Sequence, residues 1–190
     1  MPRIFGERIM LREYKLEDLQ YIRKWVNDPE VVDNLSDIFL VPHSLAETEE
    51  FLNSVLKRGR KNTYCFVIAE KGTEAYIGQI DLMNIDWKNR AAEIGIVIGR
   101  VKKRGKGIGT EAIQLLQEFV FNRLNLNRLE IKVHSNNLRA HRCYLNSGFK
   151  EEGRLRQGFY IHGKYFDNIV LSMLKSEFDS RIQAKPIVQP

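Results

Sequence analysis

A basic, glycine-rich turn is the feature of this sequence that most constrains its fold. Residues 96–99 read Ile-Val-Ile-Gly, as at the end of a strand, residues 100–106 carry five lysines and arginines, and helical spacing begins at Gly107. A strand that passes through glycines directly into a helix exposes backbone N–H groups at the helix N-terminus, where the helix dipole also favours an anion. Glycines let this backbone approach the anion closely, without an intervening Cβ. The turn therefore predicts a phosphate cradle.

The spacing of the glycines excludes two common phosphate-binding motifs. Gly105, Gly107 and Gly109 are arranged as G-x-G-x-G, whereas dinucleotide-binding turns need G-x-G-x-x-G within a βαβ unit. The P-loop pattern G-x-x-x-x-G-K-[ST] is also absent. Taken alone, these residues are equally compatible with a glycine-rich turn that only begins a helix.

The periodicity of the remaining sequence predicts an α+β chain built around one mixed sheet. Seven segments have the alternation or β-rich composition of strands: residues 8–12, 64–69, 76–83, 92–98, 129–134, 149–155 and 165–173. Four have helical spacing of apolar residues: residues 17–26, 44–56, 107–123 and 137–146. Ser44 is a candidate N-cap, and Gly59 and Gly148 are candidate helix terminators. Residues 179–190 predict a loose tail.

A second motif follows the strand predicted at residues 129–134. Residues 135–149 read Ser-Asn-Asn-Leu-Arg-Ala-His-Arg-Cys-Tyr-Leu-Asn-Ser-Gly-Phe. Asn137, Ala140 and Tyr144 are spaced to share one face of a short helix. By themselves these residues are also explained as ordinary core positions of an amphipathic helix.

Together the two motifs resemble the Gcn5-related N-acetyltransferase (GNAT) superfamily, particularly its ribosomal-protein-acetyltransferase-like and spermidine-acetyltransferase-like branch. The pattern [Q/R]-x-x-G-x-G is matched by residues 104–109, and N-x-R-A-x-x-x-Y-x-x-x-G-F by residues 137–149. Residues 25–30 and 152–167 are similar to the same branch. The resemblance implies a single GNAT-like domain over residues 8–175 with a C-terminal tail, residues 176–190. It also implies a mixed, mostly antiparallel sheet of six to seven strands, flanked by about four helices and splayed between the fourth and fifth strands.

The resemblance implies that acetyl-CoA is the co-substrate, that no metal is used, and that a substrate amine attacks the thioester directly. Backbone groups of Val97, Ile98 and Gly99 would pair with the pantetheine arm like an added strand. The pyrophosphate would be held by the backbone of Arg104, Gly105, Lys106, Gly107, Ile108, Gly109 and Thr110. Asn137 and Arg139 would contact the coenzyme from the other side.

The same resemblance implies that Tyr144 is the general acid that protonates the departing thiolate. A thiolate with a pKa of about 8.5 leaves more easily when a phenol with a pKa of about 10 lies against its sulfur. Glu93 is the leading candidate for the base, with a pKa that burial on a strand would raise, and a solvent-facing charge is the other explanation for it. His134, Asp81 and His162 are weaker candidates. Cys143 is rejected as a nucleophile because adjacent helical residues point about 100° apart.

The distribution of charge indicates the kind of acceptor. The net charge is +6, yet no lysine or arginine occurs between Lys24 and Lys57. The acidic residues of this stretch are Asp28, Glu30, Asp33, Asp37, Glu47, Glu49 and Glu50. The stretch is expected to form an acidic acceptor pocket, with Glu30, Asp33 and Asp37 binding the substrate and Trp25, Phe39 and Phe51 as walls. A polyamine, an aminoglycoside-like or sugar amine, or the N-terminus of a basic peptide or ribosomal protein would fit such a pocket; a solvated helix face is the other explanation.

Other classes of protein fit the sequence less well. The net positive charge suggests an RNA-binding module, but the basic turn contains no aromatic residue to stack on bases. An inactive acyl-CoA sensor remains an alternative, although Tyr144 argues against it. Cys65 and Cys143 lack zinc-ligand spacing, and no apolar run reaches the length of a membrane helix, so a cytoplasmic enzyme without a membrane partner is expected. A homodimer is compatible with these features.

Overall fold

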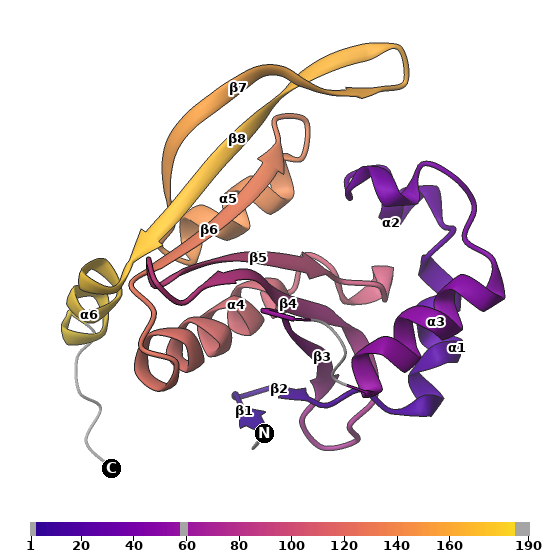
Figure 1. The fold of residues 1–190 in the computed structure, drawn as a ribbon, viewed down its shortest axis with the longest axis horizontal. Helices are drawn as coiled ribbons and strands as arrows, with labels where there is room; N and C mark the ends of the chain where they lie inside the picture. Colours follow the sequence, from indigo (N-terminus) through magenta and orange to yellow (C-terminus); the bar gives the residue numbers. More distant parts are fainter. Residues whose placement is uncertain (1–2, 58–60, 185–190) are drawn as a thin grey trace. The chain divides into compact units, whose positions relative to one another are not determined.

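The computed structural model describes residues 3–57 and 61–184, and the chain divides into two compact units (Figure 1). Unit 1 comprises residues 1–84 and 94–115, and unit 2 comprises residues 85–93 and 116–190. The strand order of the sheet is β1-β2-β3-β4-β5-β6-β8-β7. The boundary between the units falls within β5, so each unit contains its own run of paired strands.

Unit 1 contains an antiparallel run of strands. They are β1 (Ile4–Phe5), β2 (Ile9–Arg12), β3 (Tyr64–Glu70), most of β4 (Tyr76–Asp86) and the end of β5 (Ala91–Val97). β1 pairs with β2, β2 with β3 and β3 with β4, all antiparallel. This confirms the predicted meander for β3 and β4 and extends it by β1, which the sequence pattern did not indicate because two residues are too few to show alternation.

Two of the helical segments of unit 1, α2 (Pro29–Val32) and α3 (Leu45–Leu56), begin at residues whose side chains cap them. The helical segments are η1 (Leu16–Asp18), α1 (Leu19–Trp25), α2, η2 (Asp37–Phe39), α3, η3 (Val101–Lys103) and the first part of α4 (Ile108–Glu118). Ser44 and Glu47 form the predicted capping box of α3, with the Glu47 carboxylate 2.6 Å from the Ser44 amide nitrogen. Asp28 caps α2 in the same way, accepting from the Glu30 amide at 3.0 Å.

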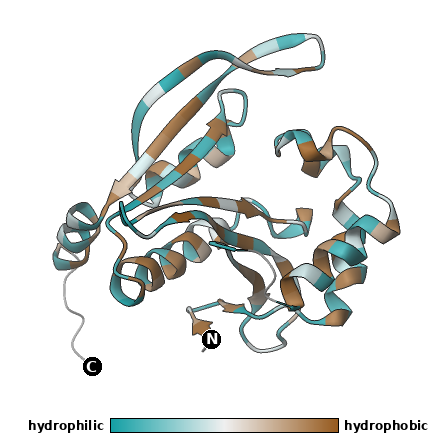
Figure 2. Ribbon diagram, viewed as in Figure 1, coloured by the Kyte–Doolittle hydropathy of each residue, from teal (hydrophilic) through white to brown (hydrophobic). Residues whose placement is uncertain are grey.

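One apolar cluster of unit 1 joins the strands to α1 and α3. Val67 and Ala69 of β3 and Val97 of β5 pack with Trp25 of α1 and Leu52 of α3, all of them buried. α1 and α3 lie side by side, and α3 and α4 each carry both brown and teal residues in Figure 2, as amphipathic helices do. The burial of these side chains is the main stabilising contribution in this layer.

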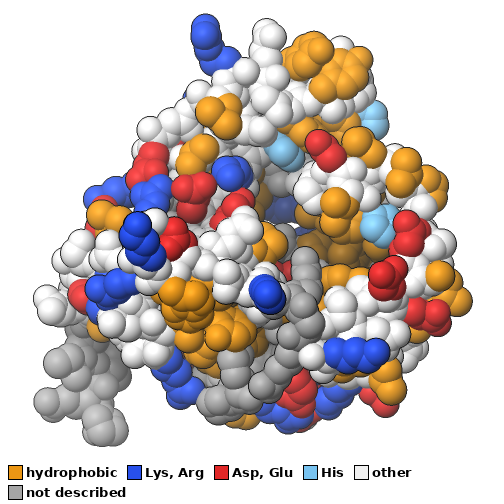
Figure 3. Space-filling view, in the orientation of Figure 1, with side chains coloured by type: hydrophobic (Ala, Val, Ile, Leu, Met, Phe, Trp, Pro, Cys, Tyr) orange, Lys and Arg blue, Asp and Glu red, His pale blue; other side chains and the backbone are white. Residues whose placement is uncertain are grey.

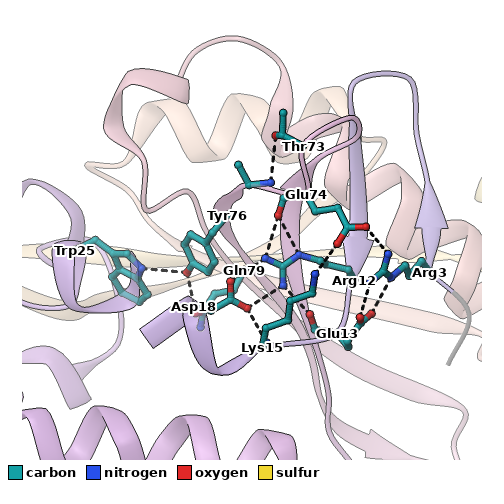
Figure 4. Close-up of polar contacts among 11 residues, drawn as sticks. Arg3, Arg12, Glu13, Lys15, Asp18, Trp25, Thr73, Glu74, Tyr76 and Gln79 are labelled. Carbon is teal, nitrogen blue, oxygen red and sulfur yellow. Dashed lines mark hydrogen bonds and ion pairs between the residues drawn. The ribbon is translucent and has the colours of Figure 1, made fainter. Parts of the chain in front are cut away.

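Two polar contacts are buried beside this cluster. Arg12 of β2 donates two hydrogen bonds of 2.8 Å to the Asp18 carboxylate, and both side chains are at most 3% exposed (Figure 4). The Trp25 indole donates to the Tyr76 hydroxyl at 3.1 Å in the same view. A bidentate, buried pair of this kind fixes the start of α1 against β2, because separating it would leave a buried charge without a partner.

Unit 2 begins with a short parallel pairing and ends in a long hairpin. Its elements are the start of β5, the π-helical segment η4 (Phe119–Arg123), β6 (Arg128–His134), α5 (Leu138–Asn146), β7 (Lys150–Ile161), β8 (Lys164–Leu174) and α6 (Lys175–Gln183). β5 pairs in parallel with β6 from Ala91 to Glu93. This pairing of three residues at the start of both strands is in keeping with the predicted splay between these strands. β8 pairs antiparallel with both β6 and β7.

The counts of elements differ modestly from the predictions. Within the described residues the sheet has eight strands rather than six to seven, and there are six α-helices rather than about four, because α2 and α6 are additional. α6 replaces the first part of the predicted loose tail and buries Phe178, to 4% exposed. Gly59 and residues 185–190 lie outside the described part of the chain. No helix among the described residues is both long and apolar enough to cross a membrane.

Candidate active site

The predicted phosphate cradle is a loop, residues 98–109, that leads from β5 into α4; we call it the glycine loop. Gly105 and Gly107 have backbone φ angles of +71° and +77°, the left-handed region that favours glycine. The first hydrogen bond of α4 runs from the Glu111 amide to the Gly107 carbonyl at 3.0 Å. The amides of Ile108 and Gly109 precede it and have no partner within the helix. The loop thus has the backbone geometry of an anion site.

Arg8, the residue before β2, fixes which way the glycine loop faces. Its Nη1 donates to the Lys106 carbonyl at 2.7 Å, and its Nε donates to the Glu111 carboxylate at 2.9 Å. Because a trans peptide directs its C=O and N–H to opposite sides, the Gly107 N–H points away from Arg8. Burial opposes ionisation of Glu111, but hydrogen bonds from Arg8 and from the Ile9 amide outweigh it and lower the pKa of this carboxyl. An ionised Glu111 therefore holds α4 against β2.

The Arg104 side chain contacts protein rather than facing outward. Its Nε donates to the Ile98 carbonyl at 2.9 Å, its Nη1 donates to the Glu30 carbonyl at 3.1 Å, and the side chain is 9% exposed. Arg104 therefore joins the start of the glycine loop to α2. Gly99 contributes by its small size, since a Cβ there would lie 2.4 Å from the Trp25 ring. The Arg104 guanidinium thus has protein partners, and the Arg104 backbone remains the part predicted to contact a phosphate.

The second motif forms helix α5 of unit 2, and most of its residues have a role in capping one of the two ends of this helix. The Asn137 side chain caps the helix, accepting from the Ala140 amide at 3.2 Å. At the other end Gly148 has a φ of +94° and donates to the Leu145 carbonyl, and the Phe149 amide donates to the Tyr144 carbonyl. These two bonds form a Schellman motif. The asparagine, the glycine and the phenylalanine are thus needed for the helix itself.

The Tyr144 side chain is the part of this motif that helix capping leaves unexplained. It is 7% exposed, and burial, with a smaller effect from Cys143, raises its pKa. Among the residues that the structure describes, none hydrogen-bonds its hydroxyl group. Tyr144 therefore keeps its proton at neutral pH, as a general acid must. Arg139 on the same helix is exposed.

The candidate bases have different surroundings. Glu93 is a quarter exposed, with the Lys132 ammonium 3.4 Å away. His134, at the end of β6, stacks on Phe159 with 3.5 Å between ring centroids, and its Nδ1 lies 2.7 Å from the Asn168 Oδ1. Because the Asn168 amide nitrogen donates to the Gly158 carbonyl, its oxygen must accept, so Nδ1 of His134 carries the proton and Nε2 is left as the basic nitrogen.

The two remaining candidates for the base, His162 and Asp81, lie in other elements of the fold. His162 sits in the two-residue turn of the β7–β8 hairpin, where it and Gly163 both have positive φ angles. Asp81 is buried in β4 of unit 1, 9% exposed. Within the part of the chain that the structure describes, no group of three or more His, Cys, Asp and Glu side chains is arranged to hold a metal ion.

The acidic stretch divides into structural and exposed carboxylates. Asp28 and Glu47 serve as helix caps, as described above. Glu30 is 66% exposed and Asp37 is exposed, whereas Asp33 is half-buried. Figure 3 shows red acidic and orange apolar side chains mixed over the region of α2 and α3. This part of unit 1 therefore presents negative charge beside apolar surface.

The predicted aromatic walls are corrected in one case. Trp25 is 3% exposed and belongs to the core, because its indole is hydrogen-bonded inside unit 1. Phe39 packs on Trp25 with ring centroids 5.9 Å apart and is half-buried. Phe51 packs edge-on against Tyr14. Of the three, Phe39 and Phe51 keep some exposed surface.

The structure groups the predicted residues by unit. The glycine loop and the acidic stretch both belong to unit 1, where Arg104 joins them. Tyr144, Glu93, Asn137 and Arg139 belong to unit 2. Sequence analysis missed Arg8, because an arginine at the start of a strand carries no signal that it binds a carbonyl 98 residues away.

Comparison with known proteins places most of the chain in one family. The family model described as the acetyltransferase (GNAT) domain matches residues 8–150. The chain is 32% identical to the uncharacterized N-acetyltransferase p20 of Bacillus licheniformis, over 94% of this chain and 99% of p20. It is also 39% identical to the putative ribosomal N-acetyltransferase YdaF of Bacillus subtilis, over 54% of this chain and 55% of YdaF.

A solved structure resembles most of the chain. The crystal structure of spermidine N-acetyltransferase from Vibrio cholerae, in complex with CoA and spermine, matches with a TM-score of 0.79 and 27% identity. The match covers 91% of this chain and 99% of the Vibrio chain. The likeness therefore extends over both units.

Proposed function

Because this chain belongs to the GNAT family of acetyl-CoA-dependent N-acetyltransferases, we propose that it acetylates a primary amine of a polyamine. The observation that carries the choice of acceptor is the Arg104 link within unit 1. Through its bonds to the Ile98 and Glu30 carbonyls, Arg104 holds the segment expected to bind the coenzyme beside α2. The Glu30 carboxylate there is 66% exposed and lies 3.9 Å from the Arg104 guanidinium. A carboxylate in that position favours an acceptor with positive charges beyond the reacting amine.

The relatives support the same class of acceptor. The Vibrio cholerae enzyme, similar over nearly its full length, is named for spermidine and was crystallised with spermine. The relative named for ribosomal acetylation is similar over about half of either chain. Basic N-termini of ribosomal proteins are therefore the second candidate, and aminoglycoside-like and sugar amines follow.

We propose the following roles in the reaction. The amine nitrogen attacks the carbonyl carbon of the thioester, a C–N bond forms and the C–S bond breaks. Tyr144 gives its phenolic proton to the departing sulfur, which its raised pKa permits at neutral pH. Amides of the glycine loop, including those of Ile108 and Gly109, hold the pyrophosphate, and the backbone of Val97 to Gly99 aligns the pantetheine arm.

The proton of the acceptor ammonium must also be removed. Glu93 is the proposed base, and Nε2 of His134 is the alternative, since its other ring nitrogen is engaged by Asn168. Glu93→Gln and His134→Gln, compared by kcat at saturating substrate, identify the residue.

The proposal is tested by mixing the protein with acetyl-CoA and one amine at a time, and measuring free CoA with a thiol reagent. The amines are spermidine, spermine, an aminoglycoside and a peptide with a basic N-terminus. We expect the polyamines to give the highest kcat/KM. CoA binding without thiol release for any amine would favour an acyl-CoA sensor, and salt-sensitive RNA retardation without CoA binding would favour an RNA-binding module.

The role of the acidic stretch is tested separately. We expect the triple change Glu30→Gln, Asp33→Asn and Asp37→Asn to raise the KM for spermidine about tenfold or more, while the KM for acetyl-CoA stays within about twofold. The matched control is Glu49→Gln with Glu50→Gln, two exposed carboxylates on α3. An unchanged KM for spermidine in the triple variant would remove these residues from the acceptor site.

A further inference from the structure

Tyr144 lies on a helix whose position rests on few buried side chains. Of the nine residues of α5, only Tyr144 is buried. Among the described residues none hydrogen-bonds its hydroxyl, so the place of this oxygen follows from the place of the helix. The hydroxyl is at the far end of the ring, and a small rotation of α5 therefore moves it further than it moves the backbone. What fixes the rotation of α5 thus also fixes the proposed acid.

The last four carbonyls of α5 are all hydrogen-bonded, two of them by side chains from other elements. A helix leaves its last four carbonyls without a partner in the helix itself. The Schellman motif described above satisfies the first two. Arg181 Nη2 donates to the Asn146 carbonyl at 2.5 Å, and Gln117 Nε2 donates to the Ser147 carbonyl at 3.0 Å. The end of α5 is therefore held by two side chains that lie outside the second motif.

Gln117 is the more buried of the two side chains. It lies near the end of α4, within unit 2, and is 2% exposed, while Ser147 is 0% exposed. Its neighbours Leu116 and Val120 are apolar and fully buried. A buried amide is costly unless it forms hydrogen bonds, whereas a leucine or methionine would fill the same space without that cost. The bond to the end of α5 is therefore what a glutamine supplies at this position and an apolar residue cannot.

Arg181 reaches α5 from α6, the C-terminal helix that the sequence pattern did not indicate. Phe178, 4% exposed, anchors α6 in unit 2. The Arg181 guanidinium lies directly against Gly148, because a Cβ added there would collide with its Nη1. A cation beside the last turn of a helix is also stabilised by the helix dipole. Arg181 thus binds the end of α5 both as a donor and as a charge.

The two bonds hold the helix from different sides. Successive residues of an α-helix lie about 100° apart around its axis, so the Asn146 and Ser147 carbonyls accept on different sides of α5. Both residues are within one turn of Tyr144. A pair of bonds spaced in this way restrains rotation of the helix about its axis, which a single bond would not. The effect on catalysis is large, since a misplacement of about 1 Å at a reacting group can lower a rate by about 10²-fold.

We propose that Gln117 and Arg181 are positioning residues, which restrain the rotation of α5 and so set the place of the Tyr144 hydroxyl. The inference rests on the proposed role of Tyr144 as the general acid. Neither side chain contacts the substrate in this scheme, and both act through the backbone of α5. Their loss therefore lowers kcat. The KM for acetyl-CoA changes less, because most of the proposed coenzyme contacts come from the glycine loop.

The test measures kcat with the best amine of the screen above, together with the KM for acetyl-CoA. We expect Gln117→Met and Arg181→Met each to lower kcat about tenfold or more and to change this KM by less than about threefold. Arg181→Lys, which keeps a cationic donor for the Asn146 carbonyl, should recover most of the loss. The matched controls are Gln114→Met, on the same helix as Gln117, and Arg123→Met, an exposed arginine of unit 2, and both should keep the wild-type kcat. Thermal unfolding checks that every variant is folded at the assay temperature.

Double variants show whether the loss of kcat passes through the hydroxyl. In a Tyr144→Phe background there is no acid left to position, so Gln117→Met should lower kcat by less than about twofold further. An equal loss in both backgrounds would mean that Gln117 only supports the fold, and it would overturn the proposal. Wild-type kcat in both Gln117→Met and Arg181→Met would overturn it as well.

A second readout needs no turnover. Protein labelled with ¹³C at the tyrosine Cζ gives one NMR signal for Tyr144, identified as the signal that Tyr144→Phe lacks. We expect Gln117→Met and Arg181→Met to shift or broaden this signal, and the two controls to leave it unchanged. An unchanged signal in both variants overturns the proposal. A shifted signal, in protein that releases no thiol with any amine, supports the restraint of α5 and contradicts only the proposed function.

Discussion

Removing the Arg104 side chain is the sharpest test of how the glycine loop is held. Arg104→Met keeps the aliphatic stem that packs inside unit 1 but deletes the guanidinium. The Ile98 and Glu30 carbonyls then each lose a donor, at 2.9 and 3.1 Å respectively. The substitution therefore removes the hydrogen bonds that join the loop to α2, while the glycines of the loop stay unchanged.

The expected loss of stability follows from these two bonds. A hydrogen bond with one charged partner contributes about 1.5–3 kcal/mol, and water entering the site recovers part of it. With the side chain 9% exposed, we expect the free energy of unfolding to fall by about 2–4 kcal/mol. For a chain of this size that lowers the Tm by about 4–16 °C.

The assay combines thermal unfolding with steady-state kinetics. Because Arg104 holds both the loop and α2, we expect the KM values for acetyl-CoA and for spermidine to rise together. Arg100→Met is the control: it makes the same change of charge in the same loop, but its side chain is 45% exposed and its ion pair with Glu70 is 3.6 Å long. If the Tm of Arg104→Met lies within about 1 °C of the Tm of Arg100→Met, the hydrogen bonds of Arg104 do not hold the loop.

Three further predictions concern unit 2 and one glycine of unit 1. Gly148→Ala should lower the free energy of unfolding by about 1–3 kcal/mol in urea titrations, because the position has a φ of +94°. Gly72→Ala is the control: its added Cβ has nothing within 4 Å, so it should change the free energy of unfolding by less than about 1 kcal/mol. Hydrogen bonds from Arg128 and Ser172 lower the pKa of Glu152 from 4.5 to about 2. The stabilising effect of the ionised Glu152 is therefore complete above pH 4.5 and is lost as the pH falls through 2. Glu152→Gln should flatten the pH dependence of the free energy of unfolding in urea over this range, and an unaltered slope would contradict the assignment. Tyr144→Phe should lower kcat by about 10²–10⁴-fold with little change in the KM for acetyl-CoA, and a kcat within about threefold of wild type would exclude Tyr144 as the acid.

Local chemistry made much of the fold predictable, and long-range contacts account for what was missed. The capping box of Ser44 and Glu47 and the helix-terminating role of Gly148 follow from a few adjacent residues, so the sequence indicated them correctly. The bond between Arg8 and Glu111 joins side chains 103 positions apart, and no periodicity reports it. α2 was missed because Pro29 reads as a helix terminator, although proline is equally suited to the first turn of a new helix.

The candidate site divides in the same way. The exposed backbone of the glycine loop was predictable from its glycines, and its binding of the coenzyme stays a prediction. The contacts of the Arg104 side chain were not predictable. A basic residue in a phosphate loop suggests contact with phosphate, whereas this side chain binds two carbonyls of the protein. The tautomer of His134 depends on Asn168, on another strand, and only the structure supplies it.

The two ends of α5 have a consequence for how such chains are recognised. Asn137 and Gly148 are demanded by the folding of a nine-residue helix, and a protein that had lost its chemistry would still need them. A descendant with phenylalanine at position 144 would match the same signature almost as well, and under the proposed mechanism it would lack the general acid. In this helix the motif therefore reports how the helix is capped, whereas the proposed chemistry depends on one hydroxyl group that takes no part in the capping.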